Sequence, residues 1–190
     1  MAEPVIGVLA LQGDFEAHRR AFEEIGAHTR EVRTAADLAT VDALVMPGGE
    51  STTMLKLLEV EALKEPLRQF GKTKPIFATC AGAILVAKEV SRPEQESLGL
   101  VDIGVERNAY GRQVHSTVTK VGLEEGGGDL EAVFIRAPII RRCGPGVTVL
   151  ARFHGDPVLV SAGKHLVATF HPELTKDRSI QRRFLESVAK

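Results

Sequence analysis

Apolar runs and amphipathic stretches alternate through the first half of the chain. The continuous apolar runs are residues 5–10, 43–46 and 75–79. Unbroken runs of this length are typical of parallel strands whose two faces are both covered by helices. Helical patterns follow the three runs, over residues 14–26, from about residue 51, and over 81–88. Asp14 is the expected N-cap of the first helix, and Gly26 is its expected end.

The pattern changes from about Leu98, where segments rich in β-branched residues replace the strand–helix alternation. These segments are residues 114–121, 132–135, 147–153, 158–161 and 166–170. We interpret them as antiparallel strands appended to the parallel core. An amphipathic helix is expected over 177–188, with Ile180 and Phe184 on its inner face. The predicted fold is α/β, with a three-layer, open, mostly parallel sheet of flavodoxin-like type in one domain, 1–190.

Composition narrows the class of protein. The chain has 190 residues, 44% of them hydrophobic and 26% charged, which suits one globular domain. A formal net charge of -1 gives no basic field for nucleic acid, and the Arg141-Arg142 pair is expected to be a solvated turn. The apolar run near the start is too short for a membrane helix and lacks signal-peptide features, so we expect a cytoplasmic protein with no membrane partner.

Cys80 is the first candidate for chemistry. It lies in Ala78-Thr79-Cys80-Ala81-Gly82, between a predicted buried strand and a predicted helix. A nucleophile on such a sharp turn projects above the strand ends, and the next backbone N–H can stabilise an oxyanion. The helix N-terminus also favours a thiolate. The alternative is an inert buried cysteine. Cys143 precedes Gly144 in a turn without a paired base and is interpreted as incidental; no disulfide or cysteine metal site is expected.

His171 and Glu173 form the second candidate, because they flank Pro172 at the end of the last predicted strand. Residues two apart in extended backbone point to the same side, and Pro172 favours that backbone at His171. Glu173 could then orient the imidazole towards a nucleophile. A surface turn with a solvated carboxylate is the alternative.

The third candidate is Pro47-Gly48-Gly49-Glu50-Ser51, at another strand-to-helix turn. Two glycines allow the backbone N–H groups to face inwards and bind negative charge, although a plain tight turn has the same composition. All three candidates lie at the carboxyl ends of predicted strands, where open α/β sheets bind ligands. We therefore expect them to converge on one site.

The Cys80 turn together with His171-Pro172-Glu173 resembles the class I glutamine amidotransferase family. Four segments are similar to a narrower family, the glutaminase subunits of pyridoxal phosphate synthase. They are residues 7–13, 47–53, 105–113 and 170–175. One position departs from the pattern, because Ala78 stands where that family usually has glycine.

The resemblance implies an activity and a partner. Cys80 would attack the side-chain amide of L-glutamine, with His171 as the proton carrier and Glu173 as its orienter. The ammonia would pass to a synthase subunit, on which glutaminase activity would depend, and no metal or organic cofactor is implied. The implied oxyanion hole is Gly48, Gly49 and Ala81. The implied glutamine-binding residues are Gly48, Gly49, Glu50, Arg107, Ile135 and Arg136. Gln12 either supports the oxyanion hole or caps the first helix.

The candidate residues are also compatible with other functions. A glutaminase serving another synthase, such as imidazole glycerol phosphate synthase, is the nearest alternative. A cysteine hydrolase of peptides and a non-catalytic domain with a vestigial triad are others. Among the remaining histidines, His18 and His28 are expected to face solvent, and His154 and His165 to lie on hairpin surfaces. His115 either lines the cleft or is structural.

Overall fold

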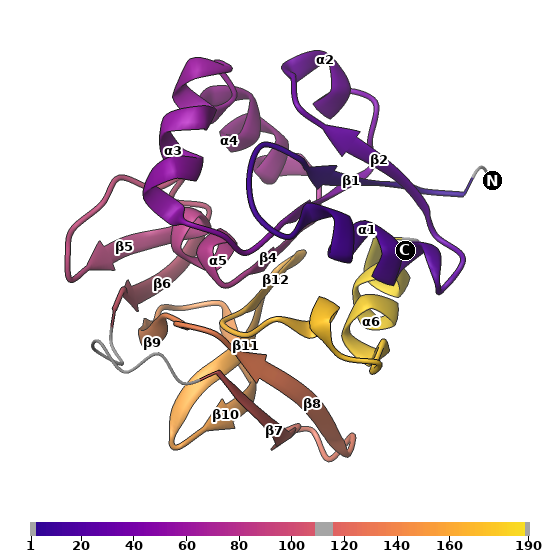
Figure 1. The fold of residues 1–190 in the computed structure, drawn as a ribbon. Coiled ribbons are helices and arrows are strands. Elements are labelled where there is room, and N and C mark those ends of the chain that lie inside the picture. The colour runs from indigo at the N-terminus through magenta and orange to yellow at the C-terminus, as the bar shows by residue number, and fades with distance from the viewer. Residues whose placement is uncertain (1–2, 109–115, 189–190) are drawn as a thin grey trace.

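A seven-stranded sheet forms the centre of the molecule in the computed structural model, which describes residues 3–108 and 116–188 (Figure 1). Its strand order is β10-β11-β12-β4-β3-β1-β2. The strands are β1 (Val5–Leu9), β2 (His28–Val32), β3 (Ala43–Met46), β4 (Ile76–Thr79), β10 (Val147–Phe153), β11 (Asp156–Ala162) and β12 (His165–Ala168). Neighbours from β2 to β12 pair in parallel, and β11 and β10 continue the sheet antiparallel.

Helices cover both faces of this sheet. They are α1 (Phe15–Glu23), α2 (Ala35–Leu38), α3 (Ser51–Val60), α4 (Lys64–Thr73), α5 (Ala81–Val86) and α6 (Ser179–Val188). Val45 of β3 packs with Phe22 of α1 and Phe184 of α6, whereas its neighbour Met46 packs with Met54 of α3. Because successive strand residues point to opposite faces, this alternation places a core on each side and explains why the strands are apolar throughout.

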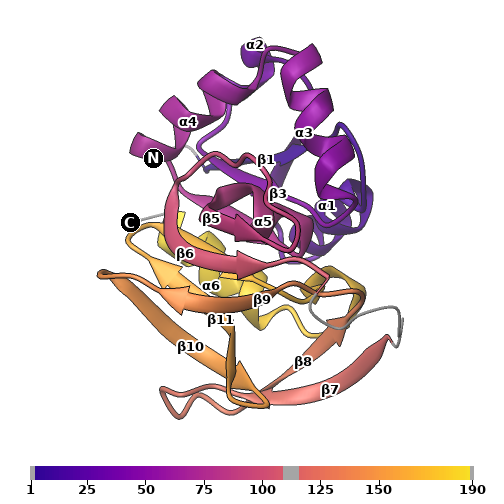
Figure 2. The same cartoon turned by 90° about the vertical axis from the view of Figure 1, so that its left-hand side faces the viewer.

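Two smaller sheets pack beside the central one, and Figure 2 shows them below α2, α3 and α4. The first has the order β5-β6-β9 and is made of β5 (Ala87–Ser91), β6 (Val101–Glu106) and β9 (Ile139–Cys143). The second is the hairpin of β7 (Thr117–Gly122) and β8 (Asp129–Phe134). No helix among the described residues is long and apolar enough to cross a membrane.

The predicted α/β fold with added antiparallel strands is confirmed, with corrections to single elements. The helix expected over 81–88 ends at Val86, because Ala87 begins β5. The strand expected over 166–170 is not an antiparallel appendage: β12 pairs in parallel with β4 in the central sheet. Part of the strand expected over 114–121 lies outside the described residues, and its described part is β7. Arg141 and Arg142 lie in β9 and not in a turn, and both are ion-paired.

Candidate active site

Cys80 occupies a sharp turn between β4 and α5. Its φ of 47° lies in the left-handed region, which costs an ordinary residue of order 1–3 kcal/mol. The turn also requires a glycine at its far side, because a Cβ on Gly82 would lie 2.2 Å from the carbonyl oxygen of Met46. Strain held at a buried cysteine above the strand ends is characteristic of a nucleophile turn. Ala78 is a regular residue of β4 whose methyl group packs in the core, so the turn forms with alanine there.

His171 and Glu173 follow β12, the strand next to β4. The His171 Nδ1 and Glu173 Oε1 atoms are 2.8 Å apart, and both side chains are buried. Their backbone differs from the expected extended form, because η1, a 3-10 helix (Pro172–Leu174), begins directly after His171. This turn folds the carboxylate back onto the ring. The predicted contact is therefore present, although a different local geometry produces it.

The sulfur and the imidazole face the same hollow. Cys80 and His171 both line a cavity of about 320 Å³. Gly48 lies close to both side chains. A Cβ there would lie 2.4 Å from His171 Cε1 and 3.3 Å from Cys80 Cβ. The Cys80 thiol also lies 3.9 Å from the carbonyl oxygen of Ile135, a long hydrogen bond. The fold thus joins the carboxyl ends of β3, β4 and β12 at one site, as the sequence predicts.

The surroundings of His171 favour the protonated, imidazolium form of its ring. Burial lowers the pKa of His171, but hydrogen bonds and charges from Cys80 and Glu173 outweigh it and raise that pKa to about 10. Burial also acts to raise the pKa of Glu173. A positive charge on His18 would lower that pKa, and the hydrogen bond and charge of His171 hold it below the usual range. A protonated ring beside a sulfur is the arrangement that stabilises a thiolate.

The Gly48-Gly49 turn is held against the nucleophile by the loop after β1. The Gln12 side-chain oxygen accepts a hydrogen bond from the backbone N–H of Glu50 at 3.0 Å. Gly13, with a φ of 91°, approaches so closely that a Cβ there would lie 1.8 Å from the Gly48 oxygen. Gln12 therefore braces the turn and does not cap the first helix. Across the cavity, Ala81 is the first residue of α5, where a backbone N–H has no helical partner.

Charged residues surround the wider part of the cavity. Glu50 caps α3 by accepting hydrogen bonds from the backbone N–H groups of Thr52 and Thr53. Burial works against it, but a hydrogen bond from the Thr53 hydroxyl together with these backbone bonds lowers the pKa of Glu50 to about 2. Arg107 is nearly buried and donates to Thr52 Oγ1 at 3.0 Å, with Glu50 at 3.7 Å. Arg136 is exposed and has no hydrogen bond or ion pair to the described residues, so its guanidinium is available to a ligand.

Two residues near the site were not predicted from the sequence. Asp14 lines the cavity instead of capping α1 with its side chain. His18 is not solvent-facing but fully buried, next to Glu173. Asp14, His171 and Glu173 offer ligand atoms within 4.8 Å of one another, a spacing that a metal ion could bridge. An ion there would have to break the bond between His171 and Glu173, and the absence of a metal stays a prediction.

The other candidates lie away from this cavity or outside the described residues. His165 is buried and accepts a hydrogen bond from the Ile76 N–H at 3.2 Å, so it is not a surface residue. His28 and His154 are exposed, as expected. His115 and residues 109–113 of the family-like segment lie outside the described residues. Cys143 ends β9 half-buried, and burial raises the pKa of its thiol.

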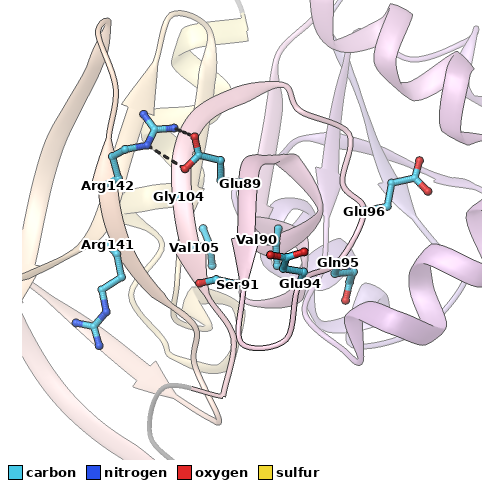
Figure 3. Close-up of a pocket in the computed structure, with 10 residues that line it drawn as sticks. All are labelled: Glu89, Val90, Ser91, Glu94, Gln95, Glu96, Gly104, Val105, Arg141 and Arg142. Atoms are coloured by element: carbon cyan, nitrogen blue, oxygen red, sulfur yellow. Dashed lines mark hydrogen bonds and ion pairs between the residues drawn. The ribbon is translucent and has the colours of Figure 1, made fainter.

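A larger hollow of about 740 Å³ lies over β5, β6 and β9 (Figure 3). Acidic residues and two arginines line it, and Figure 3 shows Arg142 directed towards Glu89 in a paired contact. Arg142 also bonds Asp102 at 2.8 Å. This hollow contains neither a cysteine nor a histidine. Nucleophile and base meet only in the smaller cavity among the described residues.

Comparison with known proteins gives a consistent result over nearly the whole chain. The model of the SNO glutamine amidotransferase family matches residues 8–190. The chain is 56% identical to "Pyridoxal 5'-phosphate synthase subunit PdxT" of Solibacter usitatus, covering 96% of this chain and 98% of that protein. It is 51% identical to the Thermus thermophilus protein of the same name, covering 96% of each. A solved structure described as a glutamine amidotransferase superposes with a TM-score of 0.91 at 47% identity, covering 97% of this chain and 99% of that one.

Proposed function

Because this chain belongs to the SNO glutamine amidotransferase family, we propose that it is the glutaminase subunit of a pyridoxal 5'-phosphate synthase. It hydrolyses L-glutamine to L-glutamate and delivers the ammonia to a synthase subunit. The relatives carry the subunit name, and the convergence of Cys80, His171 and Glu173 on one cavity supports the chemistry. Its own reaction is a hydrolysis, so any lyase step belongs to the partner. A cytoplasmic location belongs to the proposal, since the mechanism needs a reduced thiol.

The mechanism begins with attack of the Cys80 sulfur on the amide carbon of glutamine. His171 holds the proton that came from the thiol, and Glu173 keeps the ring oriented through the 2.8 Å contact at Nδ1. The oxyanion is received by the N–H of Ala81 and an N–H of the Gly48-Gly49 turn. His171 then passes its proton to the leaving nitrogen, and ammonia departs.

The second half of the reaction cleaves the glutamyl thioester. Water loses a proton to the now neutral His171 and attacks the acyl carbon, which regenerates Cys80 and releases glutamate. Arg136, a cation at the cavity wall without a partner among the described residues, is proposed to bind the α-carboxylate. Glu50 and Arg107 are hydrogen-bonded to the first turn of α3. We therefore propose that they shape the cavity around the α-amino and α-carboxylate groups of glutamine.

Ammonia needs a sheltered route, because protonation in bulk water removes its nucleophilic lone pair. A dedicated acceptor subunit follows from this chemistry and from the names of the relatives. The test is glutamate release by the purified chain alone and with a purified synthase subunit of pyridoxal phosphate synthesis. We expect the two proteins to co-purify and the rate to rise with the synthase. Stimulation by an imidazole glycerol phosphate synthase subunit instead would assign the chain to that alternative.

Glutamine hydrolysis should be lost on the alkaline side near the pKa of His171. The imidazolium delivers the proton to the leaving nitrogen, and its pKa of about 10 keeps it protonated at neutral pH. We therefore expect kcat/KM to hold through neutral pH and to fall as pH rises through about 10. The same pairing stabilises the fold fully below the ordinary value of 6.5, and that contribution is lost as pH rises through about 10. A midpoint for activity near 6.5 would contradict the assignment.

A further inference from the structure

His18 lies behind the triad, on the side of Glu173 that faces away from His171. Its Nε2 atom is 2.9 Å from the Thr79 hydroxyl oxygen and 3.2 Å from Glu173 Oε2. Both His18 and Glu173 have side chains that are fully buried. Thr79 is the residue before the nucleophile, on β4. His18 of α1 thus joins the carboxylate of the triad to the strand that carries Cys80.

The protonation of His18 follows from its neighbours. Burial lowers the pKa of His18, and the charges of Glu173, His171 and Asp14 act on it less strongly, so the ring is neutral. The one ring proton must lie on Nε2, because a lone pair there would face the ionised carboxylate of Glu173. That proton bonds the Thr79 oxygen, with Glu173 Oε2 beside it. The opposite atom, Nδ1, is buried and has no partner among the described residues.

The second carboxylate oxygen depends on this histidine. Oε1 of Glu173 is held by His171, whereas Oε2 is buried and accepts no hydrogen bond of good geometry within the described residues. The Nε2 proton of His18, at 3.2 Å, is the donor that a small rotation brings to it. Removal of that proton would take away the nearest donor that the structure records for this buried, charged oxygen, and an unpaired buried charge is costly. Rotation of the carboxylate away from His171 would relieve that cost.

Packing alone does not account for a histidine at this position. The ring meets Phe77 edge-on, with centroids 6.1 Å apart, and Phe77 belongs to the apolar cluster that also contains Phe22 of α1. A leucine would fill the same space without burying polar nitrogens, one of which is unpartnered. The useful property of the histidine is therefore the donor at Nε2.

We propose that His18 is a positioning residue of the triad, which holds Glu173 in the orientation that in turn fixes His171. This inference rests on the glutaminase function proposed above. It adds a fourth side chain to the relay, running from α1 to Glu173, then His171, then Cys80. His18 itself touches neither glutamine nor the reacting atoms.

Three substitutions separate this role from a packing role. In His18→Gln the amide nitrogen reaches the position of Nε2 and restores the donor. In His18→Asn the amide ends near the position of Nδ1, so the variant stays polar without reaching Glu173. His18→Leu removes the donor and preserves volume. The matched control is His28→Gln, because His28 is exposed on β2 and pairs only with Glu3 among the described residues.

Two readouts decide the proposal. NMR titration of the His171 ring in the full chain should show a lower midpoint in the Asn and Leu variants, equal to about tenfold weaker proton binding. The Gln variant and the control should keep the wild-type midpoint. With the synthase present, kcat should fall about 10- to 100-fold in Asn and Leu, with KM within about threefold, and Gln should recover most of the rate.

The proposal is overturned if all three His18 variants keep the wild-type midpoint, or if Gln and Asn lower it equally. Thermal unfolding of each variant shows which proteins are folded, and the Gln–Asn comparison remains decisive if the Leu variant does not fold. The glutaminase proposal fails separately, by absence of glutamate release from the wild-type chain with its synthase. The titration of His171 is independent of that result.

Discussion

Replacement of Cys80 by alanine is expected to lower glutamine hydrolysis by about 10⁴-fold or more, measured as glutamate release with saturating synthase. The sulfur is the only group in the cavity, among the described residues, that can form the glutamyl thioester. Without it, the oxyanion donors and His171 can at most assist direct attack by water. The variant should stay folded, because removal of the sulfur leaves the backbone of the turn able to form.

The matched control is Cys143→Ala. Cys143 ends β9, lies outside the cavity, and has a thiol whose pKa is raised by burial, so its loss should leave the rate within about twofold. Glutaminase activity that survives in Cys80→Ala and disappears in Cys143→Ala would place the chemistry elsewhere.

Gly48→Ala is expected to lower the rate by about 10²- to 10³-fold, because an error of 1 Å in a reacting group costs about 10²-fold. The new Cβ would lie 2.4 Å from His171 Cε1 and 3.3 Å from Cys80 Cβ, so the ring or the turn must move. Gly48 does not have a positive φ, and alanine therefore adds no backbone strain. The loss should appear in kcat, measured by glutamate release with the synthase.

Gly122→Ala provides the control for Gly48. Gly122 lies in β7, where the only described atom that an added Cβ would meet is Asp129 Oδ1, at an ordinary 3.5 Å. We expect wild-type rates for this variant and similar unfolding temperatures for both. A Gly48→Ala protein that is folded and fully active would show that His171 does not need its position against the turn.

Local sequence signals predicted much of the parallel core. Continuous apolar runs identified β1, β3 and β4, and glycine-containing turns identified the ends where ligands bind. The elements that were missed have weaker signals. In β9, Ile139–Cys143, the apolar alternation is interrupted by two arginines that pair across strands. The antiparallel placement predicted for residues 166–170 was wrong: β12 pairs in parallel with β4, and strand direction depends on such long-range pairing.

The catalytic triad could be predicted from the sequence, whereas the contact of His18 with Glu173 could not. Cys80, His171 and Glu173 follow strand ends in recognisable patterns, and the structure brings them together. His18 carries no local signal, because the first helix shows several polar residues and does not reveal which one faces β4. His18 makes its buried contacts with Thr79 and Glu173, which lie 61 and 155 residues further along the chain.

The role of Glu50 illustrates a similar limit. The family resemblance implied that Glu50 binds glutamine, and Glu50 does line the cavity. Both carboxylate oxygens, however, are bonded to Thr52 and Thr53 at the start of α3. The sequence shows the residue type at the turn, but the competition between capping and ligand binding is decided by the geometry of the helix start.

Capture of the acyl-enzyme is the most direct test of covalent catalysis by Cys80. The chain with its synthase is mixed with glutamine, quenched in acid within the turnover time, digested, and examined by mass spectrometry. We expect an added glutamyl group, held as a thioester, on the peptide that contains Cys80, and no adduct in Cys80→Ala. Rapid glutamate release with the glutamyl group found on another residue, or with no adduct at any quench time, would contradict this mechanism.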